Sequence, residues 1–328
     1  MTFYNDKHRN RSTVRKKKRK LKKRAFVVLA LLIAIVAVIG YFAYLYFTAS
    51  SVFSDAYEDD GREKSDLREH AVDPKKDNVS ILIMGVDASD TRDNAESART
   101  DSLMVATFNK KDKSVKLLSI PRDSYVYIPE VGYETKINHA YAFGGTMATI
   151  ETVENLLEIP IDYYMKVNFE AFIDVVDAVD GVKVNVPYEL KEMDSKDKKD
   201  SIHLMPGEQK LNGEEALALA RTRKLDNDVE RGKRQQEILN AIANKALSIG
   251  SVFKYDNMIH AVGNNMTTNM TFSELKSFIS YGTKGKNLNM ENLTLEGRDY
   301  QPTNTYYWQL DEASLAEVKE ALKAHLEL

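Results

Sequence analysis

The chain has 328 residues and no cysteine. This absence excludes disulfide bonds, thiol catalysis and cysteine-ligated metal sites. It does not decide the compartment, because a secreted domain of this size can be stabilised by its hydrophobic core alone. The sequence also lacks an internal repeat, and no second histidine lies at metal-ligand spacing from His139. We therefore expect His139 to be structural, or to contribute a hydrogen bond, rather than to bind a metal.

Acidic residues are nearly absent from the first 24 residues, which carry twelve Lys or Arg and one acid. The net charge of this tail is +11, so the rest of the chain carries about −14 out of a total of −3. Basic tails of this kind bind anionic lipid head groups and fix the topology of membrane proteins. Nucleic-acid binding is the alternative, but the tail has no interleaved aromatic residues and no helix-turn-helix pattern. We expect no nucleic-acid partner.

Residues 25–47 form a run of 23 residues without a charge. As a helix this run would be roughly 34 Å long, enough to cross a bilayer. A cleaved signal peptide is the alternative, but its apolar core usually has only about 7–15 residues. We predict a single-pass membrane anchor. The positive-inside rule then places the basic tail, 1–24, in the cytoplasm and the remainder in the extracytoplasmic space. The polar, charge-mixed segment 48–77 is expected to be a stalk before a domain at 78–328.

Apolar patterning in the rest of the chain alternates between strand and helix periods. We expect strands at 79–85, 103–108, 115–120, 163–168 and 182–186, and near 293–295. We expect helices at 147–157, 169–179, from Asn212 to the arginines near 221, 229–248, from 272, and 312–326, with a charged loop at 189–203. The predicted fold class is α/β, with helices on both faces of a mixed central sheet. The single N-terminal transmembrane helix precedes it.

The stretch 220–236 concentrates basic side chains between two apolar helical runs. Its four arginines are Arg221, Arg223, Arg231 and Arg234. A solvated helix face is the simplest interpretation of such a run. An oxyanion site is the alternative, because guanidinium groups bind phosphate bidentately and stay charged.

Two carboxylates and one arginine lie at the ends of expected strands. Asp87 follows the first strand and Asp101 precedes the second, so both would lie at one edge of the sheet if these strands are neighbours. Two carboxylates together with phosphate oxygens and water are the usual ligands of Mg²⁺, although aspartates that cap turns are also common. Arg122 follows the third strand and would point into the crevice where α/β folds bind ligands. The alternative is an ion pair with Asp123 or another surface acid.

Five segments together resemble the LytR-CpsA-Psr family of cell-envelope proteins. They cover roughly residues 78–248 in the family's order, and the basic tail, the single anchor and the outward domain match its layout. The segments are Gly85-Val86-Asp87, Arg99-Thr100-Asp101-Ser102, Ser119–Ser124, Lys136–Tyr141 and Ala220–Gln235. No motif can be mapped after about residue 250.

The resemblance implies a Mg²⁺-dependent phosphotransferase, with Mn²⁺ as an alternative ion. Such an enzyme moves an anionic glycopolymer, such as wall teichoic acid or capsule, from a polyprenyl-pyrophosphate carrier to peptidoglycan. By the resemblance, Asp87 and Asp101 would hold the metal and act with Arg122 in catalysis. The pyrophosphate and the neighbouring head-group site would be bound by a larger set: Arg99, Arg122, Arg221, Arg223, Asp228, Arg231 and Gln235. Helices 169–179 and 238–246 would line a slot for the prenyl chain, although a strip of Phe and Ile is more often ordinary core.

Other functions remain open at this stage. A pyrophosphatase would hydrolyse the same lipid, with water in place of the acceptor sugar. A non-catalytic envelope protein would bind the lipid or regulate assembly, and a membrane-bound transcription regulator is suggested only by the basic tail. The presence of both acids and of the arginines favours an enzyme over a scaffold.

Overall fold

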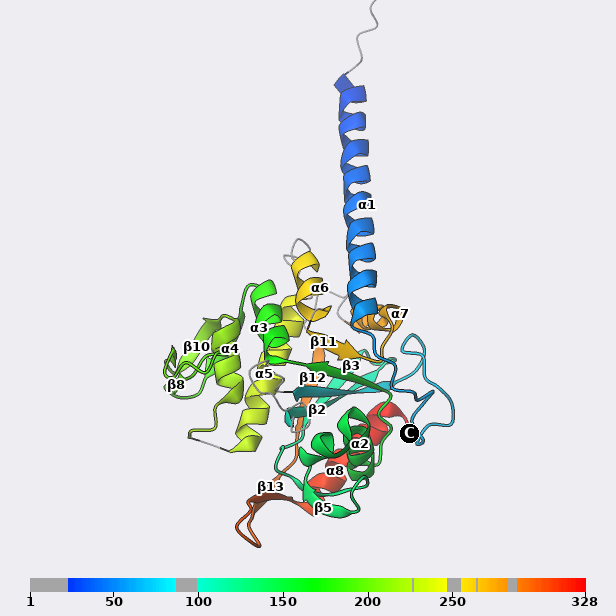
Figure 1. The fold of residues 1–328 in the computed structure, drawn as a ribbon. Coiled ribbons are helices and arrows are strands. Elements are labelled where there is room, and N and C mark those ends of the chain that lie inside the picture. Colours follow the sequence, from blue (N-terminus) through cyan, green and yellow to red (C-terminus); the bar gives the residue numbers. More distant parts are fainter. Residues whose placement is uncertain (1–22, 87–98, 226, 247–254, 264, 282–287) are drawn as a thin grey trace, which may run out of the picture. The chain divides into compact units, whose positions relative to one another are not determined.

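A computed structural model describes residues 23–86, 99–225, 227–246, 255–263, 265–281 and 288–328 (Figure 1). The chain divides into two compact units, Met1–Tyr46 and Phe47–Leu328. Helix α1 (Lys23–Asp55) contains the one helical segment in the described chain that is long and apolar enough to cross a membrane, Ala25–Asp55. Its apolar side chains are exposed, as expected for a segment that would contact lipid. The helix continues past Phe47, where we expected it to end.

The second unit is built around a six-stranded mixed sheet with the order β11-β6-β1-β2-β3-β12. Its strands, in that order, are Met266–Thr268, Tyr163–Val167, Val79–Val86, Thr100–Asn109, Ser114–Ser119 and Asn289–Thr294. β1 pairs with β2 in antiparallel and with β6 in parallel orientation, and β3 pairs in antiparallel orientation with β2 and in parallel orientation with β12. The carboxyl ends of β1, β3 and β6 therefore meet the amino end of β2 at one edge, which is where an α/β sheet usually binds its ligands.

Both faces of this sheet are buried. Alternate residues of β2 point to opposite faces, so Leu103 belongs to one core and Met104 to another. The first core is closed by α2 (His139–Leu157) and α8 (Glu312–Leu326). The second includes Leu239 of α5 (Asp228–Ala246), from the helices on the other side of the sheet (Figure 1). The predicted fold class, a mixed sheet with helices on both faces, is confirmed.

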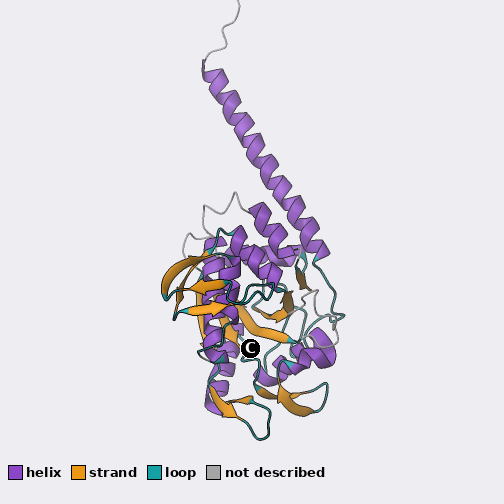
Figure 2. Ribbon diagram, turned by 60° about the vertical axis from the view of Figure 1, so that its left-hand side comes forward, coloured by secondary structure: helices purple, strands orange, loops and turns teal. Residues whose placement is uncertain are grey.

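A smaller layer stands beside the sheet. α3 (Phe169–Ala178) and α4 (Gly213–Arg221) pack with the two-stranded sheet of β7 (Val182–Val186) and β10 (Gly207–Leu211) around their own apolar core. Asn212 caps α4, because its side chain accepts a hydrogen bond from the Glu215 backbone N–H and the Glu215 carboxylate accepts one from the Asn212 N–H. The helix α6 (Tyr255–Gly263) follows α5 in the chain. Figure 2 distinguishes the helices of the structure from its strands by colour.

Several short elements differ from the sequence-based expectation. The charged segment 189–203, expected as a loop, forms an antiparallel ribbon of β8 (Leu190–Glu192) and β9 (Ile202–Leu204). The expected helix from 272 is only α7 (Phe272–Leu275), continued by a 3₁₀ turn over Lys276–Tyr281. Two more ribbons were not expected: β4 (Tyr125–Ile128) with β5 (Tyr133–Lys136), and β13 (Gly297–Tyr300) with β14 (Tyr307–Leu310).

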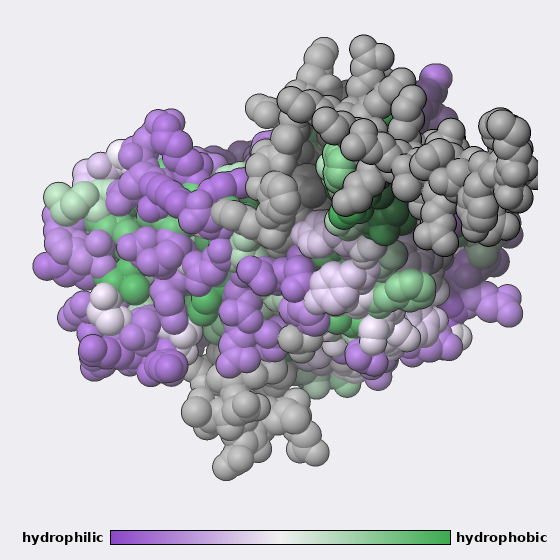
Figure 3. Space-filling model, turned by 90° about the horizontal axis from the view of Figure 1, so that it is seen from above, coloured by the Kyte–Doolittle hydropathy of each residue, from purple (hydrophilic) through white to green (hydrophobic). Residues whose placement is uncertain are grey.

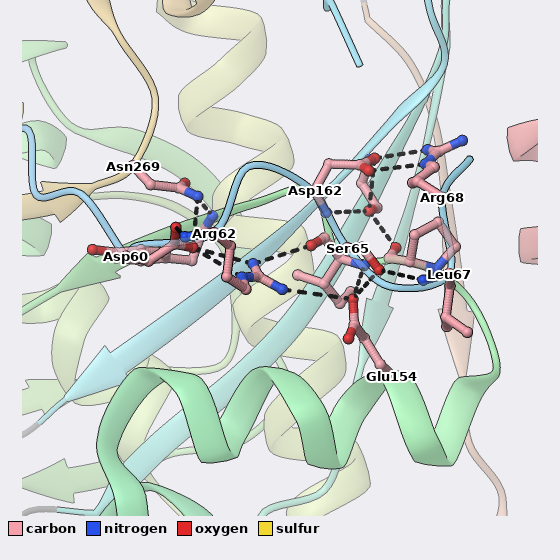
Figure 4. Close-up of polar contacts among 12 residues, drawn as sticks. Asp60, Arg62, Ser65, Leu67, Arg68, Glu154, Asp162 and Asn269 are labelled. Atoms are coloured by element: carbon pink, nitrogen blue, oxygen red, sulfur yellow. Dashed lines mark hydrogen bonds and ion pairs between the residues drawn. The ribbon is translucent and has the colours of Figure 1, made fainter. Parts of the chain in front are cut away.

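The segment that we expected to be a stalk, 48–77, makes buried contacts with the domain (Figure 4). Arg68 forms a two-pronged ion pair with Asp162, with N–O distances of 2.7 and 2.9 Å. The Ser65 hydroxyl donates to the Glu154 carboxylate of α2 at 2.6 Å. Burial raises the pKa of Glu154, whereas the hydrogen bond from Ser65 lowers it and so favours the charged carboxylate. Residues 56–77 are therefore held on the same compact unit as the sheet.

The surface shown in Figure 3 is mostly hydrophilic, with small separate apolar patches. This is the ordinary surface of a folded domain in water.

Candidate functional site

A cavity of about 420 Å³ opens at the edge of the sheet where β1, β3 and β6 end. Its walls come from the central sheet, from α3, α4 and α5, and from the β8–β9 ribbon. The polar lining residues are Asp101, Ser102, Arg122, Asn168, Glu192, Arg221, Arg223, Arg231 and Gln235. The apolar lining residues include Ile83, Met104, Val167, Phe169, Phe172, Leu217 and Leu239. A cavity that is charged at one part and apolar at another suits a ligand with an ionic head and a hydrocarbon chain.

Arg122 lies directly after β3 and reaches across to β2. One of its terminal nitrogens lies 2.5 Å from Asp101 Oδ1. Asp101 sits at the amino end of β2, where Gly85 of β1 pairs with Ser102. The two strands are neighbours, which was the condition set for Asp101 to lie at this edge of the sheet, and Asp101 lines the cavity.

Asp228, the first residue of α5, holds three arginines together. Its Oδ1 atom lies 3.4 Å from an Arg223 terminal nitrogen and 3.3 Å from one of Arg231. Its Oδ2 atom lies 3.9 Å from Arg122 Nε. Three buried atoms of this cluster have no hydrogen-bond partner among the described residues: Arg122 Nε, Arg231 Nε and Asp228 Oδ2. A buried polar group without a partner is costly, so these atoms mark a place built for a further polar ligand.

Arg231 is the most deeply buried cation of the cluster, with 6% of its surface exposed. The pKa of its guanidinium is lowered from 12.5 to about 10, mainly by burial and also by the neighbouring charges of Arg122 and Arg223, while Asp228 and Asp101 oppose the shift. Arg231 is therefore still charged at neutral pH, but its positive charge is incompletely compensated.

The four arginines and the two aspartates, Asp101 and Asp228, leave a formal charge of +2, because the further lining acid Glu192 is offset by its ion pair with Lys224. An anion with two negative charges would balance this set without a further counter-ion.

Known proteins are similar to this chain in sequence. The model of the LytR_cpsA_psr family matches residues 42–324. The chain belongs to the LytR-CpsA-Psr family. It is 41% identical over 320 residues to the polyisoprenyl-teichoic acid–peptidoglycan teichoic acid transferase TagT of Bacillus subtilis (strain 168), which covers 96% of this chain and 98% of that protein. It is 39% identical over 319 residues to TagV of the same organism, covering 94% and 80%.

Solved structures of the family are similar as well. The structure of TagT bound to LIIa-WTA matches with a TM-score of 0.70 and 39% identity, covering 82% of this chain and 98% of that chain. The structure of YwtF (TagT) with bound octaprenyl pyrophosphate lipid matches with a TM-score of 0.66 and 37% identity over the same shares. The family resemblance drawn from the five sequence segments is confirmed.

In this LytR-CpsA-Psr domain the close approach of α5 to β3 brings Arg231 to the cavity. A Cβ atom on Gly232 would lie 2.4 Å from Ser119 Oγ, so only glycine lets the helix come this near to the end of the strand. Gln235, one turn further, donates to the Ala220 carbonyl at 3.0 Å and accepts from the Ser102 hydroxyl at 2.9 Å. It links α4, α5 and β2 around the cavity.

Not every predicted site residue lies at the cavity. Arg99 is exposed and is not among the lining residues, although its charge contributes to lowering the pKa of His139. Burial is the larger cause of that shift. Asp87 lies outside the described residues, so its predicted role as a metal ligand stays a prediction. Arg234, which we kept out of the site, is buried and donates to the carbonyls of Leu219 and Thr222 at the end of α4.

The ribbon β8–β9 contributes site residues that the sequence reasoning missed. Glu192 lines the cavity and accepts a hydrogen bond from the Thr222 hydroxyl at 2.7 Å. It also lies 3.5 Å from the Lys224 ammonium. Both contacts hold the short connection that carries Arg223. The many charges of this segment suggested a solvated loop, and no local pattern marked Glu192 as a partner of residues thirty positions later.

The apolar end of the cavity agrees in part with the predicted prenyl slot. Phe169 and Phe172 come from the first of the two expected helices and Leu239 from the second. The guanidinium of Arg221 lies 4.7 Å from the centre of the Phe169 ring, so a cation–π contact marks the boundary between the charged and apolar parts.

Proposed function

We propose that this chain is a phosphotransferase that moves a teichoic-acid-type glycopolymer from a polyprenyl-pyrophosphate carrier to peptidoglycan. The relatives named above carry this activity in their names. The observation that supports it most strongly in this chain is the arginine cluster around Asp228 at the polar end of a partly apolar cavity. We further propose that residues 1–24 are cytoplasmic and that residues 48–328 are extracytoplasmic.

The donor would bind with its pyrophosphate among Arg122, Arg221, Arg223 and Arg231. Its prenyl chain would follow the apolar wall formed by Phe169, Phe172 and the neighbouring aliphatic residues. A pyrophosphate diester carries two negative charges, which the formal charge of the polar end matches. Binding would also supply the missing partners of the buried Nε atoms.

The reaction would be an in-line displacement at the phosphorus next to the polymer. An acceptor sugar hydroxyl forms the new P–O bond, the bond to the prenyl phosphate breaks, and a carboxylate at the cavity accepts the hydroxyl proton. Arginines that are already fixed by Asp228 and Asp101 stabilise the charge that develops on the leaving phosphate, and they need little rearrangement to do so. Arg122 is central because it contacts both carboxylates.

A divalent cation fits this donor set only together with the substrate. Among the described residues no group of three or more His, Cys, Asp or Glu side chains could hold a metal by itself. Asp101, whose side chain is about one-third exposed, lines the cavity and offers a carboxylate oxygen. Mg²⁺ is commonly held by one or two carboxylates with phosphate oxygens and water, so Asp101 and the predicted Asp87 would be its protein ligands. When bound, Mg²⁺ or Mn²⁺ would neutralise phosphate charge.

The test is reconstitution of the full-length chain in detergent micelles with a labelled polyprenyl-pyrophosphate-linked teichoic acid and peptidoglycan oligomers. We expect label on the peptidoglycan, loss of transfer with a chelator, and recovery with Mg²⁺. Arg122→Ala should reduce transfer by at least about a hundredfold, because it removes a fixed cation at the reacting phosphate. Release of free polymer without transfer would instead indicate a pyrophosphatase, and lipid binding without turnover would contradict both enzymatic functions.

A further inference from the structure

The ribbon β13–β14 is tied to the chain directly after Arg122. The Trp308 backbone N–H donates to the Asp123 carbonyl at 2.8 Å, and Ser124 forms an isolated bridge with Trp308. The ribbon therefore stands next to the site, although the sequence after residue 250 carried no recognisable motif. A Cβ on Gly297 would lie 2.6 Å from Trp308 Nε1, so glycine lets the indole lie flat against β13.

Aromatic rings gather on this ribbon and on the neighbouring β4. The ring centres of Tyr125, Tyr300 and Tyr307 lie between 4.8 and 6.3 Å apart. The Lys136 ammonium lies 5.9 Å from the ring centres of both Tyr306 and Tyr307. We call Tyr125, Tyr300, Tyr306, Tyr307 and Lys136 the aromatic platform.

The aromatic platform is linked to Arg122 by one residue. Lys136 Nζ lies 2.8 Å from Asp123 Oδ1, and Asp123 Oδ2 lies 4.0 Å from Arg122 Nε. Tyr306 is 37% exposed, and its hydroxyl donates to Asp299 at 2.9 Å. Burial raises its pKa most, followed by Asp299, and the negative charges of Asp123 and Asp228 act in the same direction. The Lys136 ammonium therefore contacts both the Tyr306 ring and Asp123, the residue beside Arg122.

The platform lies outside the cavity but is linked to Arg122, which lines it, through Asp123. Among the described residues, the cavity lining includes Arg122 but none of the platform residues. In-line transfer requires the attacking and leaving oxygens on opposite sides of the phosphorus. If the prenyl phosphate leaves toward the apolar cavity, the acceptor has to arrive from outside that cavity, and the platform is a surface outside it that is linked to Arg122.

The chemistry of the platform suits sugar rings. A sugar ring has an apolar C–H face, which stacks on an aromatic ring, and a hydroxyl edge, which hydrogen-bonds. The exposed tip of the ribbon supplies amide and hydroxyl groups through Gln301, Thr303 and Asn304. The charged groups around the platform are Lys136 and Arg298 against Asp123, Asp299 and Glu134. Arg122, which lies beside Asp123, balances these charges, so the surface is formally neutral and suits an uncharged sugar ring better than a polyphosphate.

We propose that the aromatic platform is an acceptor subsite that binds the sugar rings of a peptidoglycan strand beside Arg122. This inference rests on the proposed transferase function and adds where the acceptor binds. Tyr306 is its most accessible ring and would stack on a sugar next to the attacking hydroxyl.

Direct binding can be followed through Trp308, because it is the only tryptophan of the chain and lies in β14. The full-length chain in micelles is titrated with peptidoglycan-derived glycan oligosaccharides and, separately, with a polyol-phosphate oligomer. We expect saturable fluorescence change with the glycan and an affinity for the polyol phosphate at least about tenfold weaker. Equal or tighter binding of the polyol phosphate overturns the assignment.

Variants test the role of the ring itself. Tyr306→Ala should raise the acceptor KM about tenfold with little change in kcat, because the ring contributes equally before and during the reaction. Tyr306→Phe keeps the ring and should remain near the wild type. Tyr57→Ala, a tyrosine of similar exposure (42%) beside β11 at the far edge of the sheet, is the matched control.

The outcomes separate this inference from the proposed function. A wild type that transfers polymer while Tyr306→Ala keeps its acceptor KM contradicts the platform alone. If the wild type transfers no polymer but binds glycan through Tyr306, the proposed transferase function is contradicted and the glycan-binding platform is supported. A rise in donor KM as large as the rise in acceptor KM also overturns the assignment, because the ring would then serve the donor.

Discussion

Single residues of the site are placed at a cost to stability, and Arg231 is the clearest case. Its pKa of about 10 in the folded chain lies below the ordinary value of 12.5. The charged form is therefore less favoured in the folded than in the unfolded chain. The resulting loss of stability is fully present below about pH 10 and disappears as the pH rises from about 10 to 12.5. At neutral pH the site holds a charge that only a bound anion would compensate.

We predict that Arg231→Met raises the free energy of unfolding of the ligand-free chain by about 1–2 kcal/mol. The substitution removes a buried charge that repels Arg122 and Arg223, and leaves Asp228 with its other arginine partners. The same variant should lose transfer activity, because the substitution removes a side chain that is proposed to bind the pyrophosphate. Denaturant unfolding followed by Trp308 fluorescence measures the first effect, and the transfer assay the second.

Arg234→Met is the matched control, since Arg234 is equally buried in the same helix. Its guanidinium donates to the carbonyls of Leu219 and Thr222, so its loss leaves buried acceptors unpaired. We expect destabilisation by about 1–3 kcal/mol. If both substitutions destabilise the chain to the same extent, the charge repulsion assigned to Arg231 is wrong.

At the scale of elements, the contact between α5 and β3 fixes the geometry of the arginines. We predict that Gly232→Ala destabilises the domain by about 1–2 kcal/mol, despite the better helix propensity of alanine, because the new methyl group collides with Ser119. Transfer should fall at least about tenfold as Arg231 is displaced from the pyrophosphate.

A second substitution separates the collision from other effects. Ser119→Gly removes both atoms that the new methyl group would meet, at 2.4 and 3.0 Å. The double variant should therefore recover most of the lost transfer, measured with the same donor and acceptor. A double variant as inactive as Gly232→Ala would mean that α5 is not positioned by this contact.

The elements that the sequence predicted well are those with a strong apolar period. β1, β2, β3 and the helices α3, α5 and α8 bury continuous or helically spaced apolar residues, and they were expected within a few positions of their ends. The ribbons β8–β9 and β13–β14 were missed, because their short strands carry charged and polar residues and are stabilised by contacts distant in sequence. Glu192 is one example, since its partners belong to the connection after α4.

The candidate site was predictable to the same degree. Arg122, Arg223 and Arg231 were expected from their motifs, and the structure brings them to one cavity. The role of Asp228 as the common partner of these arginines follows only from the packing of α5 against the sheet. Tyr306 gave no signal, because its importance depends on a backbone bridge between β14 and the residue after Asp123.

The whole molecule combines a basic tail, an apolar helix and an acidic remainder with a locally positive cavity. The remainder carries about −14, whereas the polar end of the cavity is formally +2. An anionic polymer is therefore repelled by the net charge of the domain and attracted at the arginine cluster, which favours productive binding of its pyrophosphate end. Under the proposed function, the domain would lie on the side of the membrane where the carrier presents its polymer and where peptidoglycan is found.

We predict that the domain is extracytoplasmic and that residues 1–24 stay in the cytoplasm as part of an uncleaved anchor. The chain has no cysteine, so single cysteines at Ser12 and at the exposed Lys199 can be labelled without altering the background. In intact protoplasts a membrane-impermeant maleimide should label Lys199→Cys, whereas Ser12→Cys should react only after permeabilisation. Labelling of Ser12→Cys before permeabilisation would reverse the orientation. A shortened chain that carries no label at Ser12→Cys would show that the N-terminal segment is a cleaved signal peptide. This outcome has to be tested separately, because the positive-inside rule predicts on which side the tail lies but not whether it is retained.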